Sequence, residues 1–443
     1  METVRHGAEN PFLQKEGAKA WIVWGIAAFF YGYEFLLRAS PSVMQTEMQH
    51  TFALDAGGLG FIVSLYYWAY SSMQVPAGVL IDRYGPRSIL TCAAFICAIS
   101  TVCLGWATSP IVAGIARFMV GFGSAFALIG TFKLAGNWFP TSRFAFLAGF
   151  ALTFGTIGAT LAGKPLAILV DWIGWRPSLF FLAAIGIVNA ILLWCVVHDH
   201  PSWDRTVKKS VEHKKKERTE LDAWASFKSV IANKQSWFIG GFAAFIYIPI
   251  TCFGELWGIP YVMKCCFCDR PDAAFITSLM FVGATVGAPL FGMFSDYIEK
   301  RKLPLYIGTI GSLLIMCFVL YVPDISQMVM SVSMFILGMC LGSHMILFAL
   351  IRENNLPNAS AVAAGFGNFV CMIIPGIVQY LIGLLLDIFN QGTAIMDETS
   401  YSLLSFKLSL LTIPIGLVLA LICLALSRET YARQVCGQRS DAP

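Results

Sequence analysis

The chain has 443 residues, of which 57% are hydrophobic and only 13% are charged, and its formal net charge is +4. A soluble protein of this length needs more polar surface than that, so the composition excludes a soluble globular fold and predicts a polytopic membrane protein. The apolar runs are continuous rather than alternating, which excludes a transmembrane β-barrel.

A helix needs ~20 apolar residues to cross a bilayer. Apolar runs of about this length predict twelve transmembrane helices in an all-α fold. Six are expected in the first half of the chain, at residues 20–44, 57–81, 87–107, 110–136, 144–170 and 176–198. Six more are expected in the second half, at residues 236–262, 274–297, 304–322, 325–350, 360–388 and 402–426.

One long hydrophilic segment, residues 199–235, separates the two sets of helices. We therefore expect an amino-terminal bundle over residues 1–198, a linker, and a carboxy-terminal bundle over residues 236–443. Lysines and glutamates alternate through the linker. This pattern fits a solvated segment facing the cytoplasm, and an anionic-lipid or partner site is the alternative.

Lysine and arginine collect in the loops on one side of the predicted helices, which places both termini and the linker in the cytoplasm. The polar segment Met1 to Lys19 does not resemble a cleavable signal peptide. We expect a multi-pass protein of the plasma membrane, here the bacterial inner membrane.

A charged turn after the second predicted helix occurs twice in the chain. It runs from Gly78 to Arg87, and Gly292 to Lys302 repeats its order of small residue, aspartate and basic cluster. The two aspartates, Asp82 and Asp296, are 214 residues apart (296 − 82). Asp171 and Asp387 are separated by a similar 216 residues (387 − 171). These offsets predict two similar halves, each starting on the same side, in a parallel repeat.

Most of the thirteen cysteines lie inside apolar runs and are expected to act as small hydrophobic residues. Cys265, Cys266 and Cys268 cluster in a loop, where a metal or disulfide role is the alternative to a purely structural one. We predict no metal site and no cofactor.

Ionisable residues inside the predicted helices are costly in a bilayer and need a partner or a water-filled cavity. Glu34 and Arg38 are four residues apart on one helix face and could pair. The others are Arg117, Lys164, Glu255 and His344. Helix depth places all of these except His344 in the outer half of the membrane. The alternative is a structural Glu34–Arg38 pair, with Lys164 and Glu255 reaching the outer interface.

The charged turn resembles the signature loop of the major facilitator superfamily. The first copy matches that loop at Gly78, Asp82, Arg83, Gly85 and Arg87. The second copy keeps Gly292, Asp296, Lys300 and Arg301 but has Glu299 where glycine is expected. Arg117, within the sequence RFMVGFG, is similar to the family's fourth-helix motif. The segment Arg38 to Met44 is similar to a branch that includes bacterial anion carriers and peptide carriers.

The resemblance implies a cytoplasmic gate formed by the two loops. Asp82 would accept hydrogen bonds at the start of the eleventh helix, near Ser360, and Asp296 would do so near Ser142, when the cytoplasmic side is closed. The gate residues are Gly78, Asp82, Arg83, Gly85, Arg87, Asp296, Lys300 and Arg301. The alternative is that these charges only fix the topology.

The resemblance also implies a central cavity lined by helices 1, 4, 7 and 10. We expect the substrate site to comprise Glu34, Arg38, Arg117, Lys164, Glu255, Tyr31, Tyr67, Gln74 and His344. Surplus positive charge there favours a carboxylate, and Glu34 and Glu255 are the candidate proton carriers.

We therefore predict a proton-coupled secondary transporter of a small carboxylate-bearing solute: an amino acid, a small peptide or an organic acid. A larger anion, such as a carboxylate siderophore or a phosphorylated metabolite, is the alternative substrate. A membrane-embedded enzyme and a non-transporting sensor are the alternative classes. The expected partners are the substrate, protons and the lipid bilayer; we expect no nucleic acid, and a monomer.

Overall fold

The computed structural model describes residues 17–140, 143–200, 225–390 and 401–435. In this part of the chain, eleven helical segments are long and apolar enough to cross a membrane. The bent pair α2 (Gln45–Phe52) and α3 (Ala56–Tyr84), which meet at 111°, provides a twelfth. The predicted all-α membrane fold is thus confirmed. Ser142 and the basic linker cluster at residues 208–218 lie outside the described residues.

The first six spans form the N-terminal group. Its elements are α1 (Ala18–Ala39), the 3₁₀ turn η1 (Ser40–Val43), α2, α3, α4 (Pro86–Trp106), α5 (Pro110–Ser124), α6 (Ala127–Trp138), α7 (Phe144–Leu161), α8 (Lys164–Ile173) and α9 (Trp175–Val196). The predicted boundaries agree with these to within about one helical turn. Three of the predicted helices are broken in two, as α1 and η1, α5 and α6, and α7 and α8.

The last six spans form the C-terminal group. Its elements are α11 (Lys234–Ile248), the π-helix η4 (Pro249–Trp257), α12 (Gly258–Cys266), α13 (Arg270–Tyr297), α14 (Lys302–Tyr321), α15 (Gln327–Leu341), η5 (Gly342–Ile346), α16 (Leu347–Glu353), η6 (Pro357–Ala359), α17 (Ser360–Phe389), α18 (Leu403–Ser409) and α19 (Thr412–Leu426). Residues 225–232, within the predicted linker, are also helical.

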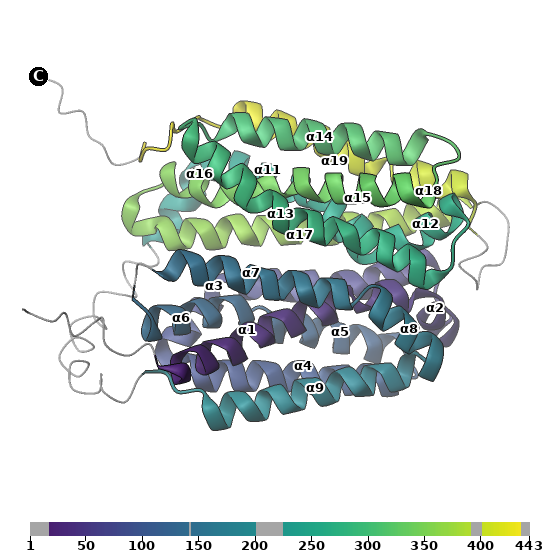
Figure 1. The fold of residues 1–443 in the computed structure, drawn as a ribbon, viewed down its shortest axis with the longest axis horizontal. Helices are drawn as coiled ribbons and strands as arrows, with labels where there is room; N and C mark the ends of the chain where they lie inside the picture. The colour runs from purple at the N-terminus through teal and green to yellow at the C-terminus, as the bar shows by residue number, and fades with distance from the viewer. Residues whose placement is uncertain (1–16, 141–142, 201–224, 391–400, 436–443) are drawn as a thin grey trace, which may run out of the picture.

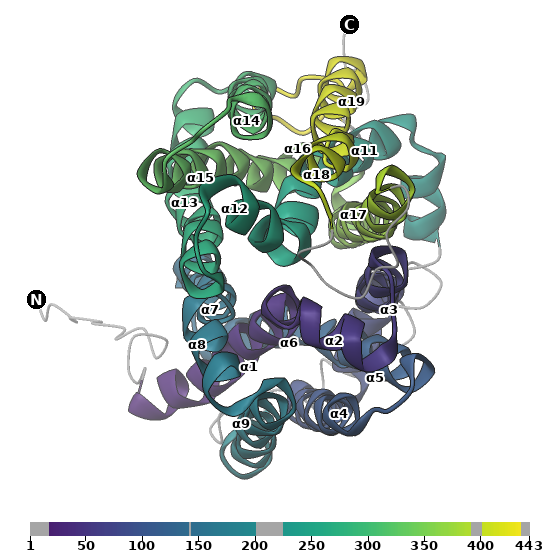
Figure 2. The same ribbon diagram turned by 90° about the vertical axis from the view of Figure 1, so that its right-hand side faces the viewer.

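The two groups lie side by side along their long axes (Figure 1). We call the end of the molecule where α6 and α16 lie, at the left of Figure 1, the linker end, and the opposite end, where α2, α8, α12 and α18 lie, the distal end. Seen from the distal end, the groups meet along two seams (Figure 2). One seam packs α3 against α17, and the other packs α13 against α7 and α8.

The charged turn joins two helices in both copies, but with different lengths: one residue, Gly85, separates α3 from α4, and four residues separate α13 from α14. Gly85 ends α3 with φ = +84°, and Pro86 then begins α4. A glycine past the helix end and a proline at the first position of the next helix suit these conformations. In the second copy Glu299, which replaces the glycine, also has a positive φ of 49°. The repeat therefore preserves a positive φ at this position although the residue and the length of the turn differ.

Candidate functional site

The centre of the molecule holds a buried ion pair at the end of α1. Glu34 and Arg38 are 0% and 1% exposed, and Arg38 Nη2 donates to Glu34 Oε1. The hydroxyl of Tyr66, on α3, donates to the same oxygen over 2.9 Å and accepts from Arg38 Nε over 3.2 Å. The rings of Phe35 and Tyr70 lie 4.2 Å and 5.0 Å from the guanidinium carbon. The charges are thus fixed by one another and by aromatic faces.

Arg117, on α5, supports the same helix end through its backbone. It donates to the carbonyl oxygens of Leu37 over 2.9 Å and of Arg38 over 3.4 Å. These are carbonyls of the last turn of α1, where the helix gives way to η1 and leaves acceptors unsatisfied. The predicted substrate contact of Arg117 is therefore replaced, in this state, by a contact that positions Arg38.

A glycine lets α5 approach closely enough for this contact. A Cβ on Gly121 would lie 2.1 Å from the carbonyl oxygen of Tyr66. No larger residue fits while α3 and α5 keep this spacing, so the glycine of the fourth-helix motif brings Arg117 and Tyr66 together.

Glu255 brings a second carboxylate to the centre, from the C-terminal group. It lies in the π-helix η4, is 1% exposed, and accepts a hydrogen bond from the hydroxyl of Tyr67 on α3. It is close enough to Arg38 to attract it electrostatically. The alternative that Glu255 reaches the membrane surface is therefore wrong.

Four buried polar atoms of this cluster have no hydrogen-bond partner among the described residues. They are Glu34 Oε2, Arg38 Nη1, Arg117 Nε and Glu255 Oε1. Unsatisfied buried groups are costly, and here they are two acceptors and two charged donors. The arrangement is suited to a guest that offers both a carboxylate and hydrogen-bond donors.

The neutral residues expected in the site lie around this cluster and toward the linker end. Tyr31 is buried with its ring 5.0 Å from that of Phe35. Gln74 Oε1 accepts from Asn368 Nδ2 of α17 over 2.7 Å, which links the two groups. His344 Nδ1 is 2.8 Å from the carbonyl oxygen of Leu341, and its ring is 5.3 Å from that of Tyr247.

Lys164 lies away from this cluster, at the distal end. Its Nζ is 2.8 Å from Asp272 Oδ1 of α13, and both side chains are more than 40% exposed. The structure thus separates Lys164 from the other charges predicted for the site. Asp272 and Asn368 were not predicted at all, because contacts between the halves leave no pattern in a single sequence.

The loops at the linker end make their polar contacts within their own groups. Asp82 Oδ1 is 2.5 Å from Lys133 Nζ of α6. Arg87 donates to the carbonyl oxygen of Trp194, and its backbone N–H donates to Asp199. Ser360, the predicted partner of Asp82, donates to the carbonyl oxygen of Pro357. Among the described residues, the predicted contact of Asp82 with the start of α17 is therefore not made in this state, and Ser142, near which Asp296 was expected to bind, lies outside them.

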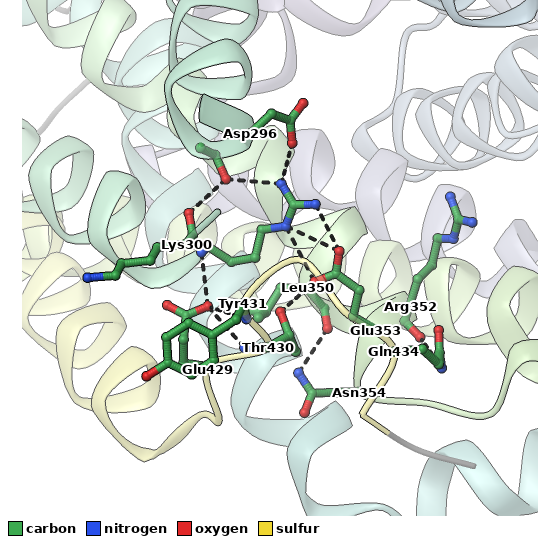
Figure 3. A network of polar contacts seen from close by, with 12 residues as sticks. Asp296, Lys300, Leu350, Arg352, Glu353, Asn354, Glu429, Thr430, Tyr431 and Gln434 are labelled. Carbon is green, nitrogen blue, oxygen red and sulfur yellow. Dashed lines mark hydrogen bonds and ion pairs between the residues drawn. The ribbon is translucent and has the colours of Figure 1, made fainter. Parts of the chain in front are cut away.

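The second loop takes part in a larger polar network at the same end (Figure 3). Arg301 forms ion pairs with Asp296, at 2.6 Å, and with Glu353, at 2.9 Å. Glu429, in the segment after α19, accepts from the backbone N–H groups of Arg301 and Lys302 at the start of α14. Burial raises the pKa of Glu429, but these bonds and two more from nearby backbone N–H groups outweigh it and lower the pKa below its ordinary value. The network ties the chain's last described segment to the C-terminal group.

Comparisons with known proteins agree with this architecture. A sequence model described as "Major Facilitator Superfamily" matches residues 23–380. The chain is 24% identical to the "Probable galactarate/D-glucarate transporter GudP" of Escherichia coli (strain K12), over 84% of this chain and 88% of that protein. It is 22% identical to the "Probable sulfoacetate transporter SauU" of Cupriavidus necator, over 71% of this chain and 75% of that protein.

Solved structures share the fold. A bacterial homologue of the human lysosomal transporter Spinster, inward-facing and unoccupied, aligns with a TM-score of 0.71 at 16% identity, covering 94% of this chain and 97% of that one. A D-xylose–proton symporter aligns with a TM-score of 0.66 at 18% identity, covering 94% of this chain and 99% of that one.

Proposed function

Because this chain belongs to the Major Facilitator Superfamily and is a secondary transporter, we propose that it moves a small organic acid together with protons by alternating access. The observation that carries the proposal is Arg38. It is a fully buried guanidinium at the contact between the two groups, with one nitrogen unpartnered among the described residues. A guanidinium binds a carboxylate through two parallel N–H bonds, so an anionic guest suits this position.

Glu34 links this anion site to protons. While ionised it occupies Arg38 Nη2, so a substrate carboxylate has to displace it. Protonation of Glu34 removes its negative charge, weakens its bond to Arg38 and leaves the guanidinium free to bind the guest. Proton uptake and anion binding then favour each other, which is the requirement for coupled transport.

The balance of buried charges also supports the coupling of anion binding to proton uptake. With every group ionised, Arg38 and Arg117 are balanced by Glu34 and Glu255. Neutralising Glu34 leaves one surplus positive charge, and neutralising Glu255 as well leaves two. A monovalent or divalent organic anion matches these two states, and Glu255 is the candidate for the second proton.

The relatives support an organic acid over a peptide. Their names give galactarate, D-glucarate and sulfoacetate, which are small acids, and all but sulfoacetate carry several hydroxyl groups. Tyr31, Gln74, Asn368 and His344 lie on the linker side of Arg38 and offer neutral hydrogen-bonding groups for such a chain. We place the linker end in the cytoplasm of a bacterium, following the distribution of lysine and arginine.

Uptake into proteoliposomes tests this function. The panel is D-glucarate, D-galactonate, sulfoacetate, a dipeptide, a hexose phosphate and a hydroxycarboxylate siderophore, each with and without an inward proton gradient. We expect gradient-stimulated uptake of one or more of the first three and its loss in Arg38→Ala. Uptake confined to the dipeptide, the hexose phosphate or the siderophore would contradict the substrate class. Binding without flux would favour the sensor alternative.

A further inference from the structure

Two aspartates at the distal end each reach from one group to the start of a helix in the other. Asp387, near the end of α17, accepts from the backbone N–H groups of Ala56 over 3.1 Å and Gly57 over 2.7 Å, at the first turn of α3. Asp171, near the end of α8, lies 3.1 Å from the guanidinium of Arg270, the first residue of α13. Each of the two seams therefore has an aspartate contact between the groups at this end.

These two contacts are related by the internal repeat. Asp171 and Asp387 are separated by 216 residues (387 − 171), and the helices they meet begin after Asp55 and Asp269, separated by 214 (269 − 55). Asp55 and Asp269 play the same local role, since each accepts from the backbone N–H three residues further on. The same arrangement has thus been built twice, once on each seam.

The two copies differ in chemistry for a clear reason. The start of α3 offers two consecutive N–H groups to Asp387, whose negative charge also suits the positive end of the helix dipole. In α13 the second position is Pro271, which has no N–H to donate. Arg270 supplies the donor with its side chain instead, and it also donates to Glu47 and to the carbonyl oxygen of Val43.

We propose that Asp171 and Asp387 are a pair of distal latches that hold the distal end closed. They are the counterparts of Asp82 and Asp296 at the linker end, which in this state pair with Lys133 and Arg301 of their own groups. Opening the distal end breaks both latches, and the linker-end aspartates are then available for their contacts between the groups. The inference does not depend on which solute is carried.

Hydrogen–deuterium exchange of the full-length protein in nanodiscs tests the latches. In Asp387→Asn we expect exchange at residues 56–62 to become about tenfold faster, equivalent to ~1.4 kcal/mol. Asp171→Asn is expected to do the same at residues 270–276. In both variants exchange at residues 360–366, at the linker end of α17, slows as that end closes. Asp55→Asn is the matched control, because it removes a charge at the start of α3 within one group, keeps the N-cap acceptor, and is expected to leave that linker-end exchange unchanged.

A steric variant separates the latch from general loss of stability. A Cβ on Gly383 of α17 would lie 2.3 Å from the carbonyl oxygen of Ala56, so Gly383→Ala forces the two helices apart without removing a charge. We expect the same exchange pattern as in Asp387→Asn. Faster distal exchange in Gly383→Ala with unchanged exchange in both aspartate variants would overturn the proposal, as would a linker-end response in the Asp55→Asn control.

Discussion

Replacing Glu34 with glutamine removes the charge that competes with an organic acid for Arg38 while keeping the side chain's shape. The Arg38–Glu34 bond joins two opposite charges, whereas the bond from Arg38 to the glutamine keeps the ionised donor but loses the ionised acceptor, which we expect to weaken it by ~1–1.5 kcal/mol. A substrate carboxylate therefore displaces the glutamine more easily by ~1–1.5 kcal/mol. That difference corresponds to about five- to tenfold tighter binding.

The variant is best compared with the wild type by titration calorimetry between pH 6 and pH 8.5, using the panel member that binds most tightly. Wild-type affinity is expected to fall as the pH rises, because ionised Glu34 competes for Arg38. Glu34→Gln is expected to bind with little pH dependence and with its largest advantage at high pH. Glu255→Gln, which neutralises the other buried carboxylate, should keep the Glu34-dependent slope. A pH dependence in Glu34→Gln equal to that of the wild type would refute the displacement of Glu34 from Arg38 by the substrate.

Three further substitutions test separate contacts. Tyr67→Phe removes the hydroxyl that donates to buried Glu255 across the groups, so we expect a loss of ~1–3 kcal/mol from the distal-closed state, seen as faster deuterium exchange at residues 56–62. Arg117→Ala removes a buried donor from the carbonyls of Arg38 and Leu37, of which Leu37 keeps its bond from the Ser40 hydroxyl. It should lower the thermal unfolding temperature along with substrate affinity, whereas lost affinity at unchanged stability would restore Arg117 as a substrate ligand. The lowered pKa of Glu429 means that its stabilising effect is present above its ordinary value of 4.5 and is lost as the pH falls through the lower folded-state pKa. Glu429→Gln should therefore flatten the acid limb of the melting-temperature profile, and an unaltered limb would argue against the role of Glu429 at the start of α14.

The sequence was informative wherever a pattern is local. Apolar runs located the helices, because a bilayer selects for length and hydrophobicity along a continuous segment. The four-residue spacing of Glu34 and Arg38 pointed to their pairing, because such residues share a helix face. The shape of the charged turn was predictable at Gly85 but not at Glu299, where a non-glycine residue adopts a positive φ.

Contacts between distant segments were less predictable. Lys164 was grouped with Arg38 by its charge and depth, but its partner Asp272 lies in the other half of the chain. Arg117 was assigned to the substrate because a buried cation needs a partner, and the carbonyls of α1 that fill this role carry no sequence signal. Asp171 and Asp387 were recognised as a repeated pair, but their role became apparent only once α3 and α13 were seen beside them.

The central claim is that an organic acid takes the place of Glu34 on Arg38 as Glu34 gains a proton. Calorimetric titration at pH 8 in several buffers of different ionisation enthalpy measures this directly, as the number of protons taken up for each substrate molecule bound. Net proton uptake by the wild type, lost in Glu34→Gln while binding persists, is the predicted result. Binding by the wild type with no proton uptake, or equal uptake in Glu34→Gln, would contradict the account.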